Sequence, residues 1–146
     1  MKIDHAATEF EVLAADALKA LLDQVSAIKL KELKHEPQAR GRSAEILAHI
    51  DVHGHSHTLA CEVNCDTRPS KVRASLKKLR DCAAHFAGDA TPVLIAPYLS
   101  PEVQAMCKES RAGFLDLEGN ARLTLGDVFI GKRSVQQRPA AQSALQ

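Results

Sequence analysis

The chain has few aromatic residues and no excess of charge of either sign. Its 146 residues include no tryptophan, one tyrosine and four phenylalanines, and 19 lysines and arginines stand against 18 aspartates and glutamates. The core must therefore be aliphatic. A formal net charge of +1 excludes a histone-like protein or a polybasic membrane binder, because both need a strong field of one sign. At this length one apolar core is sufficient without disulfides or a structural metal.

Long apolar runs and paired cysteines are also lacking. No 18 apolar residues occur in succession, and Met1–His5 carries no basic segment leading into an apolar run. Neither export nor membrane insertion is therefore expected. A four-cysteine zinc site needs two close pairs, and only Cys61 and Cys65 are close. The sequence predicts a cytoplasmic protein with reduced cysteines.

Hydrophobic periodicity predicts a mixed α/β (α+β) fold. The expected helices are Ala6 to about Val25, Pro69–Phe86, and one that begins at Ser100-Pro101 and stops by Gly113. The expected strands are 27–33, 45–52, 58–64, 91–96, 114–117, 121–125 and 128–130. This order gives a hairpin or meander, a right-handed crossover helix and further strands, with helices flanking a mixed sheet. The strand 27–33 suits a short edge position.

The expected domain spans residues 1–131. Residues 132–146 are polar and rich in glutamine, alanine and proline, and they show no periodicity. Such a composition cannot bury enough apolar surface to offset the entropy of ordering. We therefore expect a single domain followed by a disordered C-terminal tail.

Two carboxylates stand on neighbouring expected strands. Strand alternation places Glu62 and Asn64 on one face. Asp51 lies near the end of the preceding strand, and cross-strand neighbours can bring two carboxylates within a few ångströms. Carboxylates that converge repel each other unless a cation lies between them, and Mg²⁺ commonly uses one or two of them plus waters. The pattern predicts a divalent-metal site at Asp51 and Glu62.

Asp51, a gap of ten residues and Glu62-Val63-Asn64 resemble the motif of the restriction-endonuclease-like, or PD-(D/E)xK, nuclease superfamily. Its pattern is Asp, a gap of some ten residues, then Glu-x-Lys. The resemblance covers about residues 6–117, including the order of elements. It implies an Mg²⁺- or Mn²⁺-dependent endodeoxyribonuclease, a hydrolase whose metal is held by Asp51, Glu62 and the main-chain carbonyl of Val63. A carboxylate of the first helix, Glu9 in preference to Glu11, would join them.

The motif departs from the superfamily at Asn64, which stands where a lysine positions water and stabilises charge on the phosphate. Losing one such donor typically costs about 100- to 1,000-fold in rate. The superfamily can supply the lysine from the following helix, where Lys71 is the candidate. The alternative is a catalytically inactive nuclease-fold module that serves regulation or binds a protein partner, in a defence or toxin-antitoxin setting.

A second resemblance covers residues 96–121, which are similar to poorly characterised bacterial regulator-like proteins. In those proteins a nuclease-like domain precedes a winged helix. Asp116 and Asn120 lie in this segment, beside the expected turn Glu118-Gly119-Asn120. The simplest interpretation is that their side chains hold the turn by hydrogen bonds to the backbone.

The helix expected over 69–86 begins with a dense cluster of cations. With no acid between positions 68 and 80, the cations are Arg68, Lys71, Arg73, Lys77, Lys78 and Arg80. Such a surface neutralises phosphates, and the shortage of aromatics favours contact with a duplex backbone over base stacking. DNA is therefore the expected partner, and the superfamily resemblance permits a homodimer. The alternative is a solvated helix surface whose charges pair with nearby acids.

His53, His55 and His57 occupy alternate positions beside Asp51 and superficially match a His-x-His zinc motif. Gly54 interrupts the alternation, so the three imidazoles need not converge. A polar hairpin turn is the favoured interpretation, with a zinc hydrolase as the alternative.

Overall fold

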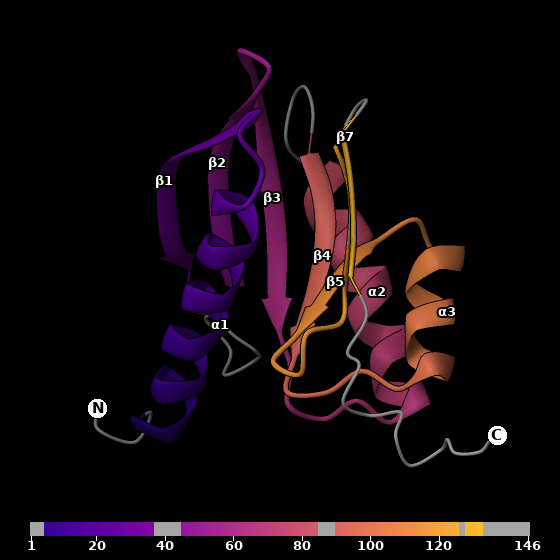
Figure 1. Ribbon diagram of the computed structural model, residues 1–146. Coiled ribbons are helices and arrows are strands. Elements are labelled where there is room, and N and C mark those ends of the chain that lie inside the picture. The colour runs from indigo at the N-terminus through magenta and orange to yellow at the C-terminus, as the bar shows by residue number, and fades with distance from the viewer. Residues whose placement is uncertain (1–4, 37–44, 85–89, 126–127, 133–146) are drawn as a thin grey trace, which may run out of the picture.

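One mixed sheet separates helix α1 from helices α2 and α3 (Figure 1). The computed structural model describes residues 5–36, 45–84, 90–125 and 128–132. The elements are α1 (His5–Asp23), β1 (Ile28–Glu36), β2 (Glu45–Val52), β3 (His55–Val63), α2 (Pro69–Ala84), β4 (Ala90–Ala96), α3 (Pro101–Glu109), β5 (Gly113–Asp116), β6 (Ala121–Leu125) and β7 (Val128–Lys132). The predicted fold class and order of elements are confirmed. The expected turn at 126–127 and the tail beyond residue 132 lie outside the described residues.

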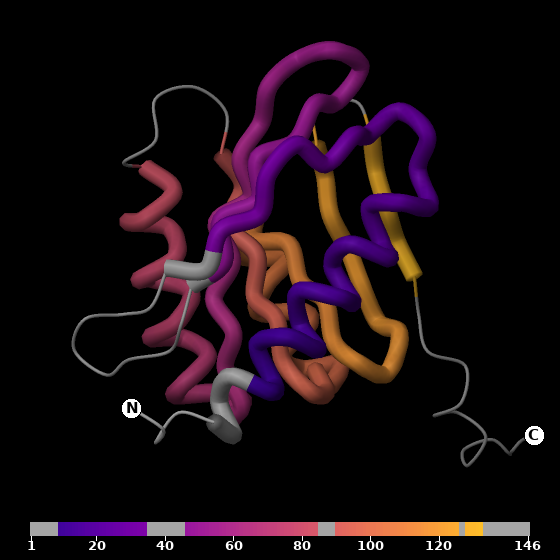
Figure 2. Tube along the Cα trace, turned by 90° about the vertical axis from the view of Figure 1, so that its left-hand side faces the viewer, coloured from indigo at the N-terminus to yellow at the C-terminus, as the bar shows by residue number. Residues whose placement is uncertain are grey.

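The seven strands lie in the sheet in the order of the sequence. β1, β2 and β3 are antiparallel, β3, β4 and β5 are parallel, and β5, β6 and β7 are antiparallel again. Each parallel step needs a crossover, which α2 and α3 provide. Successive right-handed crossovers in one direction place both helices on the same face. α1 is left to cover the other face, as the second view shows (Figure 2).

The pleat of the central strands divides the apolar residues between two cores. On β3, Leu59, Cys61 and Val63 belong to the core beneath α1. On β4, Val93 and Ile95 face α1, whereas Leu94 and Ala96 pack with α2 and α3. Of the described helices, none is long and apolar enough to cross a bilayer.

β2 and β3 form a hairpin with a turn shorter than the sequence suggested. His53 has φ of 52° and Gly54 has φ of 84°, and two positive φ values in succession are what a type I′ turn requires. The turn is therefore His53-Gly54, and His55 to His57 already belong to β3. Glycine adopts this conformation without strain.

β1 is an edge strand, as predicted, although it is longer than expected. Its register against β2 shifts between Leu30 and Glu32, which marks a β-bulge. A bulge bends a strand and interrupts its ladder of hydrogen bonds.

α3 begins and ends with side-chain and backbone caps. The hydroxyl of Ser100 accepts a hydrogen bond from the Val103 amide at 3.3 Å, and Pro101 follows at the first helical position, as the sequence predicted. At the other end Ala112 N donates to Cys107 O at 2.9 Å and Arg111 N donates to Lys108 O at 3.0 Å. This is a Schellman motif with Arg111 at φ of 60°.

We expect Gly113→Ala to lower the free energy of unfolding by about 1 to 3 kcal/mol. A Cβ atom at Gly113 would lie 2.6 Å from Leu123 Cδ2 and 3.0 Å from the carbonyl oxygen of Arg122. Leu123 is fully buried, so neither neighbour has room to move. Urea unfolding measures the difference.

Gly131→Ala is the matched control. There the added Cβ would meet the ring of Phe129, which packs against Arg122 but is exposed, so it can shift at lower cost than the buried Leu123. A loss at Gly131 as large as that at Gly113 would show that close contact inside the sheet is not the cause.

Candidate functional site

Asp51 and Glu62 do not converge, so the prediction that their carboxylates lie close together is wrong. Asp51 is the register partner of Ser56, and Glu62 is the register partner of Glu45. The two carboxylates therefore lie six residues apart along β3, about 20 Å at the usual rise per residue. This separation follows from the two-residue turn at 53–54. In such a hairpin, each residue of β2 pairs with the residue of β3 that lies equally far from the turn. Asp51 sits beside the turn and Glu62 at the far end of the strand.

The remaining residues of the predicted metal site are also dispersed. Asp51 Oδ2 instead pairs with Lys31 Nζ of β1 at 3.3 Å. Glu9 is exposed on α1, and Glu11 on the same helix is half-buried. α1 covers the face of Val63, opposite the face on which Glu62 contacts α2. Within the described residues, no three histidine, cysteine, aspartate or glutamate side chains are grouped to hold a metal ion.

Glu62 is a buried carboxylate between β3 and α2. Its side chain is 2% exposed. Its Oε2 accepts a hydrogen bond from Ser75 Oγ at 3.3 Å and pairs with Lys78 Nζ at 3.3 Å. Its Oε1 is buried and has no hydrogen-bond partner in the described part of the chain. Lys78 is the counter-ion that this buried carboxylate needs, because desolvation of an unpaired carboxylate costs several kcal/mol.

Asn64 extends the same polar network and connects the end of β3 to α2. Its Nδ2 donates to Ser75 Oγ at 2.8 Å, and its Oδ1 accepts from the Asp66 amide at 2.9 Å. Ser75 thus receives a hydrogen bond from Asn64 and donates one to Glu62. These contacts give Asn64 a structural role at the position of the motif lysine. A catalytic role for Asn64 stays a prediction.

The lysine that reaches Glu62 is Lys78, and Lys71 is exposed near the start of α2. The sequence contained a signal for this. Lys78 lies three residues after Ser75 and directly before Leu79, at the border of the buried face of α2. A lysine at such a border can run its aliphatic stem along apolar surface and place its ammonium on a nearby acid.

Two of the six predicted nucleic-acid contacts are occupied by ion pairs. Lys78 pairs with Glu62, and Arg68 Nη2 pairs with Asp66 Oδ2 at 2.7 Å. The hydrogen bond from the Arg68 guanidinium lowers the pKa of Asp66 to about 2. The remaining cations, Lys71, Arg73, Lys77 and Arg80, are exposed, and none has a carboxylate within 4.0 Å in the described structure. We call these four residues the basic face of α2.

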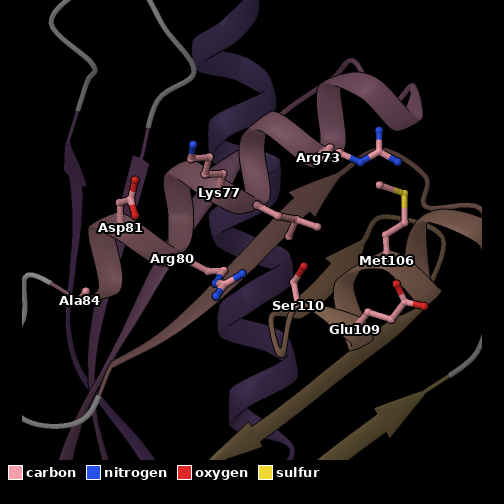
Figure 3. Close-up of a pocket in the computed structure, with 9 residues that line it drawn as sticks. Arg73, Lys77, Arg80, Asp81, Ala84, Met106, Glu109 and Ser110 are labelled. Carbon is pink, nitrogen blue, oxygen red and sulfur yellow. The ribbon is translucent and has the colours of Figure 1, made fainter.

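A groove of about 640 Å³ lies between α2 and α3 and borders this basic face. Leu76 and Met106 supply apolar surface, and Arg73 and Arg80 flank it. Figure 3 shows Arg73 and Arg80 reaching toward α3, whereas Lys77 points away from it. Asp81 and Glu109 are acids in the same lining. The groove is open, and its lining combines apolar surface with three cations and two acids, an excess of positive charge that can attract phosphates.

The histidines of the hairpin do not form a cluster. His53 lies in the turn and His55 is exposed on β3. His57 is half-buried, and its Nε2 hydrogen-bonds Thr91 Oγ1 of β4 at 2.7 Å. The described residues therefore favour the polar turn over a zinc site. Within the described residues no disulfide joins the four cysteines, and burial raises the pKa of the Cys107 thiol to about 12.

Asp116 and Asn120 hold the β5–β6 turn, as predicted. Asp116 Oδ1 accepts from the amides of Glu118 and Asn120, each at 2.9 Å. Its Oδ2 accepts from Asn120 Nδ2 at 2.8 Å and from the Leu99 amide at 2.9 Å. One buried carboxylate thus joins this turn to the loop between β4 and α3.

No model of a protein family matches the sequence, and no curated protein matches it. Among solved structures, that of EndoMS in apo form is similar at 10% sequence identity with a TM-score of 0.46. The match covers 71% of this chain and 45% of the other chain. The chain therefore spans less than half the length of that protein. A TM-score of this size supports no inference, and the fold stands on the strand order and crossovers described above.

Proposed function

We propose that this domain binds the sugar-phosphate backbone of duplex DNA through the basic face of α2. The observation that carries the proposal is the set of four exposed cations, Lys71, Arg73, Lys77 and Arg80, none paired with a described carboxylate. A cation that is already held by an acid gains little from DNA, whereas an unpaired cation neutralises a phosphate and releases counter-ions condensed on the DNA. The groove beside α3 gives the backbone a concave path along the helix.

Backbone contact fits this surface better than base stacking does. The exposed aromatic side chains in the described residues, Tyr98 and Phe129, lie on other elements. A single-strand binder needs aromatic platforms next to its cations. The basic face of α2 carries none, so it supplies attraction to phosphates without reading bases.

The test replaces three cations, Arg73→Gln, Lys77→Gln and Arg80→Gln, in one variant. We expect its affinity for a short duplex to fall about 30-fold at physiological salt, and the slope of log affinity against log salt to shrink by about 2 to 3. Fluorescence anisotropy between about 50 and 200 mM salt measures both quantities.

A matched control removes the same net charge elsewhere through Lys19→Gln, Lys29→Gln and Lys34→Gln. These lysines are exposed on α1 and β1. The control should bind with nearly the wild-type slope. Equal losses in the two variants would mean that net charge, and not the basic face of α2, attracts DNA.

The predicted metal ligands do not fit a shared Mg²⁺ or Mn²⁺ ion, since Asp51, Glu9 and Glu62 lie apart and Lys78 already neutralises Glu62. We therefore favour the inactive nuclease-fold alternative, a binding module without phosphodiester hydrolysis. Dimerisation and a protein partner remain predictions from the resemblance. Light scattering on the purified chain would test the first of these.

Hydrolysis is the second candidate function, favoured by one observation. Glu62 Oε1 is buried next to a lysine and has no partner among the described residues. Plasmid incubation with Mg²⁺ or Mn²⁺ tests it. Cleavage that disappears in Glu62→Gln and survives in Asp51→Asn would establish a site at Glu62, and no cleavage by the wild type would remove this candidate.

A further inference from the structure

A second pocket lies where the start of β4 meets the end of α3 and one side of β6. It has a volume of about 370 Å³, within the range of small-molecule sites. It shares no lining residue with the groove beside α2. Three cations line it, Lys108, Arg111 and Arg122, and none of its described lining residues is acidic.

The three cations have no acidic partners in the part of the chain that the structure describes. None forms an ion pair within 4.0 Å with any described carboxylate. Lys108 and Arg111 stand at the C-terminal end of α3, where positive charge also favours the helix dipole. Arg122 lies on β6, so no helix dipole accounts for its positive charge at this position. Its guanidinium packs over the ring of Phe129 at 4.9 Å, which holds it in place.

The wall between the cations is built of small residues. Ala112 and Gly113 contribute no bulky side chain, and Gly113 cannot accept one because Leu123 lies behind it. Thr124 on β6 adds a hydroxyl group to the lining. A hydroxyl beside guanidinium and ammonium groups that are not ion-paired with described acids contributes to the donor set that phosphate oxygens require.

We propose that this pocket binds the phosphate groups of a small phosphorylated molecule. Three cations match the charge of a phosphate or diphosphate group, and the volume leaves room for a compact organic portion. The inference does not depend on DNA binding by α2, because the two linings are separate.

The test is calorimetric titration of the full chain with pyrophosphate and with inorganic phosphate at fixed ionic strength. We expect wild-type binding that weakens at least about tenfold in a Lys108→Gln, Arg111→Gly variant, because each lost cation removes a charge-assisted hydrogen bond. Arg111→Gly keeps the fold, since glycine suits the positive φ at that position. An Arg122→Gln variant tests the cation on β6 separately and should also weaken pyrophosphate binding.

The Lys19→Gln, Lys29→Gln, Lys34→Gln variant, which removes charge outside both the pocket and the basic face of α2, serves as the control and should bind pyrophosphate like the wild type. Absence of pyrophosphate binding, or equal binding by the pocket variants, would overturn the proposal. If duplex DNA binds through Lys108, Arg111 and Arg122 while pyrophosphate does not, the pocket belongs to a nucleic-acid surface and the small-ligand assignment is wrong.

Discussion

An Asp116→Ala variant is expected to unfold with a free energy about 3 to 5 kcal/mol below that of the wild type. The carboxylate is 2% exposed and accepts four hydrogen bonds. Alanine would remove the acceptor of the buried Leu99 amide and of two donors of Asn120. The β5–β6 turn and the loop before α3 would both lose their anchor. Chemical denaturation with a fixed m-value measures the loss.

Asp116→Asn distinguishes hydrogen bonding from packing. Each carboxylate oxygen of Asp116 faces two donors, so an amide in either orientation sets its NH₂ against N–H groups. We expect this near-isosteric variant to lose about 2 to 3 kcal/mol. Glu118→Gln, on an exposed side chain of the same turn, should change stability by less than about 0.5 kcal/mol. A wild-type stability for Asp116→Asn would contradict the proposed role of the carboxylate.

A Lys78→Met variant is expected to lower the free energy of unfolding by about 3 kcal/mol. Glu62 is 2% exposed, and Lys78 Nζ at 3.3 Å is its described counter-ion. Methionine preserves most of the apolar stem of lysine but leaves the carboxylate with the Ser75 hydroxyl alone. The loss is limited because Lys78 itself is 37% exposed, so water can approach the pair. Lys77→Met, one residue earlier and exposed, is the control with little expected change.

Glu62→Leu should cost less than Lys78→Met, although both break the same ion pair. Leucine removes the buried charge together with its unpaired Oε1, and Lys78 can turn its ammonium into solvent. The double variant should then lie close to Glu62→Leu, so that a double-mutant cycle gives a coupling of about 2 kcal/mol or more. Additive losses would show that Glu62 and Lys78 do not stabilise the fold as a pair.

The element order was accessible from sequence because each element carries a strong local signal. The spacing Val72, Leu76, Leu79 predicted α2, and the Ser100-Pro101 cap located the start of α3. The predicted C-terminal end of α2 at Phe86 lies outside the described residues. The length of β1 was harder to predict. Its lysines and its bulge break the alternation that identifies a strand.

The arrangement of the site depended on information that the sequence motif does not contain. The gap between Asp51 and Glu62 matched a family pattern, but register is set by the turn, and a turn at His53-Gly54 sends the two residues to opposite ends of β3. Lys78 reaches Glu62 only because α2 packs with that face toward β3. Spacing places Lys78 at the border of the buried face of α2, but the orientation of the helix on the sheet, which is a tertiary property, decides that this border faces Glu62.

The bulged edge of β1 also affects how molecules of this protein can assemble. An open edge strand invites a second sheet to pair with it. Here the edge carries exposed lysines at positions 29, 31 and 34 and a bulge between Leu30 and Glu32. A neighbouring strand would have to desolvate these ammonium groups and accept a broken ladder of hydrogen bonds. Continuous sheet formation through β1 is therefore disfavoured, and a homodimer would have to form through another surface.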